Sequence, residues 1–295
     1  MEFSWTYTGE SPVQLKKFIK EQGVSRALLS KIKFQGGEIR VDGRVQNVLY
    51  LLKDGETLTV TMPTELEHET VLVDEADIEI VYEDPHYLVV NKPAETASIP
   101  SQYHPNGTMA NRVKNYYKKM NYPDQVIHVV TRLDRDTTGL MLFAKHSFAH
   151  GMLDKALRNK EVKKTYQAVV GGNVAELAFS GEIKAPITRD MTSLLKRKVG
   201  DGKEAHTSYK LLFRNDKIAL VEVQLHTGRT HQIRVHFEYL GTPLLGDEMY
   251  GGRMDLGIKR QALHCSNLEF VHPFKGEILS FYQELPSDMA AFRKE

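Results

Sequence analysis

The chain has 295 residues and a formal net charge of only +1, because 39 Lys and Arg residues are offset by 38 Asp and Glu residues. Its content of 41% hydrophobic and 26% charged residues is typical of a globular protein and excludes a disordered chain. The single cysteine, Cys265, excludes an intrachain disulfide and a cysteine-based zinc site. Residues 1–7 lack a signal-peptide pattern, and no apolar run approaches the roughly 20 residues that span a bilayer. We therefore expect a cytoplasmic protein with no membrane partner.

The first 62 residues have the pattern of a small α+β unit. Ser11-Pro12 predicts the start of one helix, and Ser25 predicts the start of a second that ends at paired glycines. Short strands are expected at residues 38–41 and 58–61, with Asp42-Gly43 as a hairpin turn.

Positive charge is concentrated in this segment. Between Pro12 and Arg44 eight basic residues face only three acidic ones, which is the local charge excess that nucleic acid attracts. The alternative is that these residues are solvated helix faces with no partner. The candidate nucleic-acid contacts in this segment are Lys16, Lys17, Arg26, Lys31 and Arg44.

An acidic stretch separates this unit from the rest of the chain. From Gly55 to Asn91 there is no Lys or Arg, whereas Glu65, Glu67 and Glu69 begin a cluster of carboxylates. With Pro63 this composition predicts a linker at residues 63–76. Because carboxylates repel phosphate, we expect the linker to lie off any RNA path.

Residues 132–140, Arg-Leu-Asp-Arg-Asp-Thr-Thr-Gly-Leu, lie between two apolar runs that predict strands at 126–130 and 140–144. Their composition is typical of a tight loop. A carboxylate that is poorly hydrated but lies near a guanidinium stays ionised, which suits a nucleophile or a general base. The alternative from composition alone is a salt-bridged surface turn.

Two further segments carry candidate functional residues. Residues 163–170 predict a strand in which Tyr166, Ala168 and Val170 share one face, and a tyrosine in a strand is most often a core residue. Residues 225–236 contain Arg229 just ahead of a helix that we expect Thr230 to cap. His231 and His236 lie on different faces of that helix and lack neighbouring ligands, so we expect no metal.

Other polar groups leave alternatives open. Lys92, at the end of the strand predicted at 87–90, is a candidate phosphate contact or an ordinary solvated lysine. The glycine-containing basic segment 189–204 predicts either a mobile RNA-contacting loop or an ordinary exposed one.

The segment 132–140 resembles the signature of the RluA/RluD-type pseudouridine synthases, and the strand around Tyr166 and the helix after Arg229 resemble two further motifs of that family. The resemblance implies that Asp134 is catalytic, that Tyr166 stacks on the target base and helps to remove the C5 proton, and that Arg229 pairs with Asp134. It also implies that Arg132 fills the space left by an extruded nucleotide. The family usually has His where this chain has Thr131, and residues 95–100 depart from its pattern as well.

Residues 24–44 resemble the alpha-L RNA-binding module of ribosomal proteins. Together the two resemblances predict an alpha-L module at 1–62, the linker at 63–76 and a catalytic domain at 77–295. The implied fold class is α+β, with a mixed, largely antiparallel sheet, flanking helices and a small α+β RNA-binding domain.

We therefore expect a monomeric isomerase that converts specific uridines to pseudouridine in RNA, with large-subunit ribosomal RNA as the favoured substrate. The reaction adds and removes nothing, so no cofactor is expected. The alternatives are a transfer RNA pseudouridine synthase and a non-catalytic RNA-binding factor for ribosome assembly. A glycosidase that uses Asp134 and Asp136 as its carboxylate pair is disfavoured, because the two side chains would have to lie roughly 5 to 9 Å apart on either side of a sugar.

Overall fold

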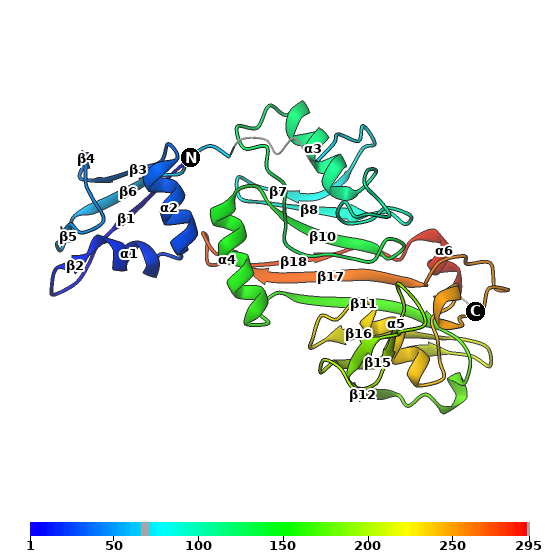
Figure 1. Cartoon of the computed structure of the whole chain (residues 1–295). Coiled ribbons are helices and arrows are strands. Elements are labelled where there is room, and N and C mark those ends of the chain that lie inside the picture. The colour runs from blue at the N-terminus through cyan, green and yellow to red at the C-terminus, as the bar shows by residue number, and fades with distance from the viewer. Residues whose placement is uncertain (66–70, 294–295) are drawn as a thin grey trace.

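The computed structural model of the chain describes residues 1–65 and 71–293, and it shows a small N-terminal lobe beside a body built on one long sheet (Figure 1). Glu67 and Glu69 of the predicted linker lie outside the described residues. In the N-terminal lobe (residues 1–62) one sheet has the order β1 (Glu2–Thr6), β6 (Thr57–Thr61), β3 (Glu38–Val41) and β4 (Arg44–Val45), and β2 (Val13–Gln14) pairs with β5 (Leu51–Leu52). The lobe also contains α1 (Leu15–Glu21) and α2 (Arg26–Phe34).

Local sequence explains most of this lobe. The Ser25 side chain accepts a hydrogen bond from Leu28 N at 3.1 Å and so caps α2, as predicted. Asp42 and Gly43 both have positive φ, which is the conformation of a two-residue hairpin turn between β3 and β4. The helix predicted from Ser11-Pro12 is wrong at its start. Residues Val13–Gln14 pair with Leu51–Leu52 as strands, so α1 begins only at Leu15.

The body is built on a sheet in which most neighbouring strands are antiparallel. Its order is β12 (Ser180–Lys184), β15 (His206–Arg214), β16 (Ala219–Leu225), β11 (Lys163–Val170), β17 (Leu263–Val271), β10 (Thr138–Ala144), β8 (Tyr87–Lys92) and β7 (Glu79–Glu83), with β18 (Ile278–Tyr282) on β17 and β9 (His128–Val129) on β10. A separate hairpin joins β13 (Ile187–Arg189) to β14 (Arg197–Val199). The predicted α+β class with a mixed, largely antiparallel sheet is confirmed.

β17 and β10 run parallel to each other at the centre of the sheet, and only Thr138 and Gly139 pair with β17 there. Gly139 has a φ of 108°, and a Cβ at this position would lie 2.2 Å from the carbonyl oxygen of Cys265. Only glycine permits this approach of the two backbones. It places the loop that precedes β10 beside the middle of the sheet.

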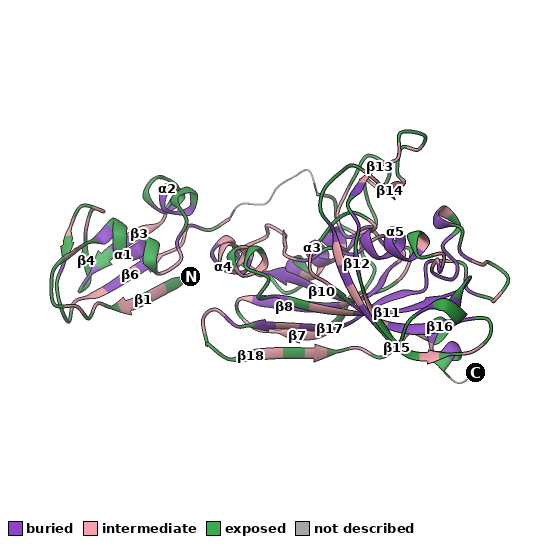
Figure 2. Cartoon of the chain, turned by 90° about the horizontal axis from the view of Figure 1, so that it is seen from below, coloured by how far each residue is buried: buried purple, intermediate pink, exposed green. Residues whose placement is uncertain are grey.

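Helices cover both faces of the sheet, and Figure 2 shows the strands between them as mostly buried. Leu88, Val90 and Phe143 pack with α3 (Met109–Lys119) on one face. The alternate side chains of the same strands pack with α4 (Ser147–Arg158), and farther along this face the core includes α5 (Gln232–Tyr239). The remaining short elements are α6 (Ser287–Ala290) and the 3-10 turns η1 (Val174–Glu176), η2 (Glu248–Tyr250) and η3 (Ala291–Arg293).

The N-terminal lobe contacts the body through aromatic residues. Phe148 of α4 is buried within the apolar core of the lobe, and its ring meets that of Phe3 edge-on at 4.8 Å. This contact holds the lobe at one end of the body (Figure 1). Within the described residues, every helix is too short or too polar to cross a lipid bilayer.

Candidate active site

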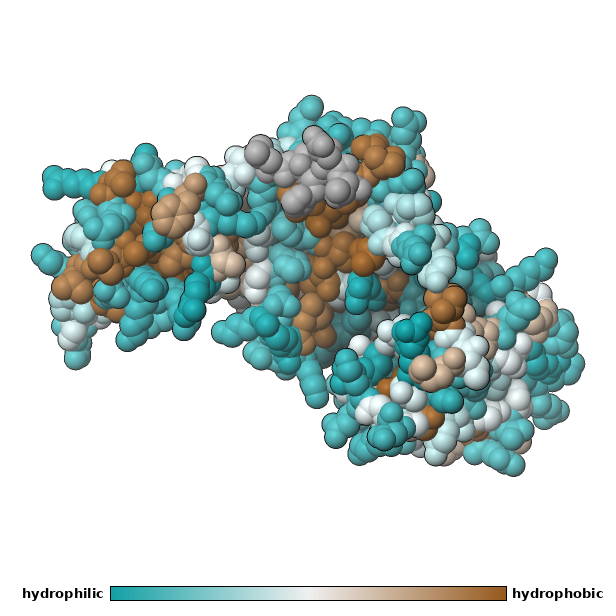
Figure 3. Space-filling view, in the orientation of Figure 1, coloured by the Kyte–Doolittle hydropathy of each residue, from teal (hydrophilic) through white to brown (hydrophobic). Residues whose placement is uncertain are grey.

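A pocket of about 570 Å³ opens on the body where the loop before β10, the strand β11 and the start of α5 converge. This volume lies in the range of sites that hold small molecules. Figure 3 shows the molecule hollowed between the part that carries α3 and the part that carries β15. The predicted catalytic residues Asp134, Tyr166 and Arg229 all line the pocket, as does Arg132.

Hydrogen bonds to its backbone hold the loop of residues 132–137 in place. Ser98 Oγ accepts from Leu133 N at 2.9 Å and donates to Leu133 O at 2.7 Å, so it fixes the residue before Asp134 on both sides. Thr137 N donates to the backbone carbonyl oxygen of Asp134 at 3.1 Å, which closes a tight turn over residues 134–137. Arg260 Nη1 donates to Asp136 O at 3.0 Å. A loop anchored at three of its residues presents the Asp134 side chain in a defined position.

Lys92 contributes to the same anchoring. Its side chain is fully buried, and Nζ donates to the carbonyl oxygens of Pro93, Thr96 and Arg135 at 2.6–2.8 Å. Burial lowers the pKa of Lys92 to about 7, against the opposing attraction of Asp136 and Asp134. The phosphate-contact interpretation of Lys92 is therefore wrong, because its ammonium group is enclosed by protein carbonyls.

Asp134 meets a buried arginine that sequence analysis did not assign. Arg234 Nη1 lies 3.4 Å from Asp134 Oδ2, while Nε and Nη2 of the same guanidinium bind the two carboxylate oxygens of Asp247 at 2.6 and 2.8 Å. Burial lowers the pKa of Arg234, but its hydrogen bond with Asp247 and the charges of Asp247 and Asp134 raise the pKa overall. The Tyr250 ring lies 4.8 Å from the guanidinium carbon. The arginine is thus a fixed positive charge beside the Asp134 carboxylate.

The predicted pairing of Arg229 with Asp134 is not present. Arg229 is exposed, and its Nε donates instead to the carbonyl oxygen of Glu204 at 2.8 Å. The predicted cap is also wrong, because α5 begins at Gln232 after His231 adopts a left-handed φ of 57°. The buried side chain of Gln232 accepts from Arg229 N and from Thr227, which turns Arg229 away from the helix. Arg234, which lies within α5, reaches the carboxylate instead.

One feature of the sequence sets Arg234 apart: it is a charged residue next to the apolar stripe of a helix. This feature does not identify the anion that binds Arg234. The expected apolar stripe of this helix contains Ile233 and Phe237, and Arg234 and His236 are polar residues buried beside it. A buried guanidinium requires a buried anion. Asp247 and Tyr250 could not be found in this way, because they lie in a loop and a 3-10 turn without a periodic pattern.

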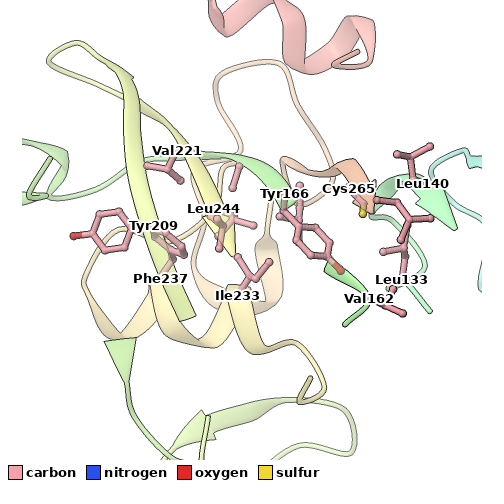
Figure 4. Packing of buried hydrophobic residues seen from close by; sticks show 14 of the residues in the cluster. Leu133, Leu140, Val162, Tyr166, Tyr209, Val221, Ile233, Phe237, Leu244 and Cys265 are labelled. Atoms are coloured by element: carbon pink, nitrogen blue, oxygen red, sulfur yellow. The ribbon is translucent and has the colours of Figure 1, made fainter. Parts of the chain in front are cut away.

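Tyr166 lies at the base of the pocket between Ile233 of α5 and Cys265 of β17, with its hydroxyl group directed toward Leu133 and Val162 (Figure 4). It is buried, and burial raises its pKa well above 10, with further increases from Cys265 and Asp134. Burial also raises the pKa of Cys265, to about 11. At neutral pH Tyr166 is therefore a neutral, mainly apolar surface at the base of the pocket.

The histidines near the pocket have protein partners. His231 Nδ1 lies 2.9 Å from the Tyr250 hydroxyl oxygen, and His236 bonds with Thr207 Oγ1 and Ala185 O. Residues 187–199 form the β13–β14 hairpin, so part of the segment predicted as a loop is a pair of strands. In residues 1–65 and 71–293 no three His, Cys, Asp or Glu side chains cluster as metal ligands.

The other predicted RNA-contacting residues lie outside the pocket, in the N-terminal lobe. Lys16 and Lys17 are on α1, Arg26 and Lys31 are on α2, and Arg44 begins β4. All five are exposed. The structure thus separates a basic lobe from a pocket that contains buried charge pairs.

Comparisons with known proteins show which family the chain belongs to. The profile of the RNA pseudouridylate synthase family matches residues 86–239. The uncharacterized RNA pseudouridine synthase YjbO of Bacillus subtilis is 45% identical over 282 residues, which cover 95% of this chain and 98% of that protein. Ribosomal large subunit pseudouridine synthase D of Pseudomonas aeruginosa is 38% identical over 267 residues, with 85% and 82% covered.

A solved structure shares the fold. Human RNA Pseudouridylate Synthase Domain Containing 4 superimposes with a TM-score of 0.57 at 23% identity, over 72% of this chain and 90% of that one. The sheet, the pocket and the sequence matches together define a pseudouridine synthase. The chain belongs to the RNA pseudouridylate synthase family, so the expected RluA/RluD-type membership is confirmed. It is an isomerase that converts uridine to pseudouridine in RNA.

Proposed function

We propose that this enzyme modifies uridine in large-subunit ribosomal RNA and that Asp134 is its catalytic carboxylate. The relatives from Pseudomonas aeruginosa and Xanthomonas campestris that are named for the ribosomal large subunit are 38% and 35% identical to this chain. The observation that carries the catalytic assignment is the contact between Asp134 and Arg234 within a pocket of about 570 Å³.

The chemistry follows from the charges around the pocket. The N1–C1′ bond of uridine breaks, the uracil turns, and C1′ bonds to C5. Asp134, which lies beside the guanidinium of Arg234, supports this exchange at C1′ either as a nucleophile or as a base toward the ribose. Tyr166 provides the face on which the uracil stacks. Since atoms are only rearranged within the substrate, the reaction requires no cofactor.

The target nucleotide must leave its stack to reach the pocket of Asp134, at a cost of a few kcal/mol. We assign to Arg132, exposed at the rim, the role of occupying the vacated position. Arg229 lies at the same rim, and its exposed guanidinium suits a backbone phosphate.

The N-terminal lobe supplies contacts with RNA outside the pocket. We assign residues 1–62 as an RNA-binding module, 63–76 as the linker and 77–295 as the catalytic domain. The exposed side chains of Lys16, Lys17, Arg26, Lys31 and Arg44 support this role, because such charges bind RNA backbone and recognise its shape.

The proposal is tested by tritium release from RNA labelled at uracil C5. Wild-type enzyme, Asp134→Asn and the matched control Asp136→Asn are offered large-subunit ribosomal and transfer RNA transcripts. Asp136 lies in the same loop, and its carboxylate is 3.8 Å from Nε of Arg135. Asp136→Asn therefore removes one carboxylate from this loop, as Asp134→Asn does.

We expect release from ribosomal RNA by the wild type and by Asp136→Asn, and a loss of at least about a thousandfold in Asp134→Asn. Release by Asp134→Asn at the wild-type rate would exclude the catalytic assignment. Release from transfer RNA alone would replace the proposed substrate with the other class.

A further inference from the structure

Removal of the C5 proton is a step that the Asp134–Arg234 pair does not explain. Once C1′ has bonded to C5, that carbon still carries its hydrogen, and the base becomes aromatic again only when a proton leaves. Asp134 acts at the sugar in the proposed function. The buried Tyr166 has a pKa well above 10, so at neutral pH it carries its proton and is a poor base.

Lys164 is placed to take this proton. It lies two residues before Tyr166 on β11, and residues two apart in a strand share a face. β16 pairs with β11 in continuous register from Thr165 onward, and the register shift between β11 and β17 at Thr165/Tyr166 comes from the extra residue Ser266 in β17, so the alternation along β11 is kept. Lys164 lines the same pocket as Asp134 and Tyr166, and its Nζ lies 5.8 Å from the centre of the Tyr166 ring.

The Lys164 amine is also not engaged elsewhere. Over the described part of the chain it makes no hydrogen bond or salt bridge with the protein, whereas its neighbour Lys163 pairs with Glu269 at 2.8 Å. The titratable and charged groups that act on it are Cys265 of β17 and Arg132 and Asp134 of the loop. Burial lowers the pKa of Lys164, so a larger share of it is the neutral amine than for an exposed lysine.

We propose that Lys164 is the general base that removes the proton from C5 of the rearranged uracil. The electron pair of the C5–H bond forms the C5=C6 double bond, and the electrons of the N1=C6 bond move to N1. The proton passes to the Lys164 amine. N1 takes one proton from the resulting ammonium or from water, so the overall proton count is unchanged. This proposal depends on the pocket of Asp134 being the catalytic one.

The test separates proton removal from the earlier steps by means of a fluorinated substrate. In RNA with 5-fluorouridine at the target position, fluorine cannot leave C5 as a cation, so the reaction stops after the new C–C bond has formed. Loss of 5-fluorouridine from nuclease digests of this RNA then measures bond cleavage and rearrangement alone. Tritium release from ordinary RNA measures the complete sequence.

Three variants are compared with the wild type: Lys164→Met, Lys164→Arg and the control Lys163→Met. We expect both Lys164 variants to slow tritium release by about 10²–10⁴-fold, which is the usual contribution of a general base. The same variants should consume 5-fluorouridine RNA at close to the wild-type rate. Lys163→Met should be normal in both assays, because its side chain is on the other face of β11.

The competing role for Lys164 is contact with a phosphate, which requires only positive charge. Arginine keeps that charge but does not become a neutral base. Restoration of tritium release by Lys164→Arg, or an equal loss in the fluorinated and ordinary assays, would therefore overturn the proposal. In Asp134→Asn both assays should fail together, so failure of the pocket assignment is distinguishable from failure of the lysine assignment.

Addition of small amines to Lys164→Ala provides a second measurement that does not depend on the packing of a new side chain. We expect methylamine or ethylamine to restore tritium release in proportion to the free amine, with no effect on Asp134→Asn. Absence of rescue in a variant that still consumes 5-fluorouridine RNA would count against Lys164 as the base.

Discussion

Arg234 and Asp134 are 100 residues apart in the chain, and Arg234 Nη1 lies 3.4 Å from Asp134 Oδ2. The same guanidinium donates two hydrogen bonds to the carboxylate of Asp247, which is almost fully buried. Asp247 therefore determines where the positive charge beside Asp134 lies. This chain of three residues joins a loop before β10, a helix and the turn that follows it.

Replacing Asp247 should cost stability as well as activity. Asp247→Asn leaves the Arg234 guanidinium buried without its main anion, and breaking a buried pair in this way costs about 3–5 kcal/mol. The free energy of unfolding from urea titration measures the loss. Asp255→Asn is the control. It breaks the exposed ion pair with Arg253 and should leave the urea midpoint of unfolding unchanged. Equal midpoints for the two variants would contradict the proposed anchoring by Asp247.

The two arginines of the pocket should differ in which kinetic parameter they affect. Arg234→Lys keeps the charge but loses the two-pronged bond to Asp247, so we expect the single-turnover rate at saturating RNA to fall by about a hundredfold. Arg229→Ala should weaken RNA binding and leave that rate within about threefold of wild type. If Arg229→Ala had the larger effect on the rate, then Arg229 and not Arg234 would support Asp134 in the complex with RNA.

Gly139 should tolerate no side chain. In Gly139→Ala the new Cβ would meet the carbonyl oxygen of Cys265, and φ is 108° in a region that L residues rarely adopt. We expect a loss of about 2–4 kcal/mol of unfolding free energy. Gly151 of α4 has open space where a Cβ would lie, so Gly151→Ala should instead stabilise by about 0.5–1 kcal/mol. Thermal and urea unfolding of the pair distinguish the two effects.

Lys92 should give the unfolding free energy a distinct dependence on pH. Its pKa is about 7 in the folded protein and about 10.4 in an unfolded chain, so between these values the unfolded state binds more protons. The contribution of Lys92 to stability therefore rises with pH from about 7 to about 10. The difference in unfolding free energy between wild type and Lys92→Met, measured by urea titration at several pH values, should rise across this window. A constant difference would show that Lys92 is equally protonated in both states.

The basic residues of the N-terminal lobe should control the salt dependence of RNA binding. Each phosphate that a basic side chain neutralises releases counterions. Replacing Lys16, Lys17 and Arg26 with glutamine should therefore lower the slope of log affinity against log salt by about 0.7 for each phosphate that is no longer neutralised. Filter binding across a salt series measures this slope. Lys217→Gln, in the turn between β15 and β16, provides a control that should leave it unchanged. An unaltered slope in the triple variant would argue against RNA contact by the lobe.

The sequence by itself determined what depends on neighbours along the chain. The cap at Ser25, the turn at Asp42-Gly43, and the alternation that buries Tyr166 are local, because they arise from backbone conformation and strand period. The nine residues 132–140 likewise predicted the family, because a sequence motif is recognised from residue identities alone, without knowledge of the fold.

The tertiary structure alone decided which charges meet. Arg229 and Arg234 lie in one short motif, and only the left-handed turn at His231 together with the bonds of Gln232 directs one to the rim and the other to Asp134. The contact of Lys92 with the carbonyl oxygen of Arg135 and the placement of Lys164 in the same pocket as Asp134 depend in the same way on segments brought together from distant parts of the chain. Electrostatic partners are set by distance in space and by the exclusion of water, and neither is a property of sequence spacing.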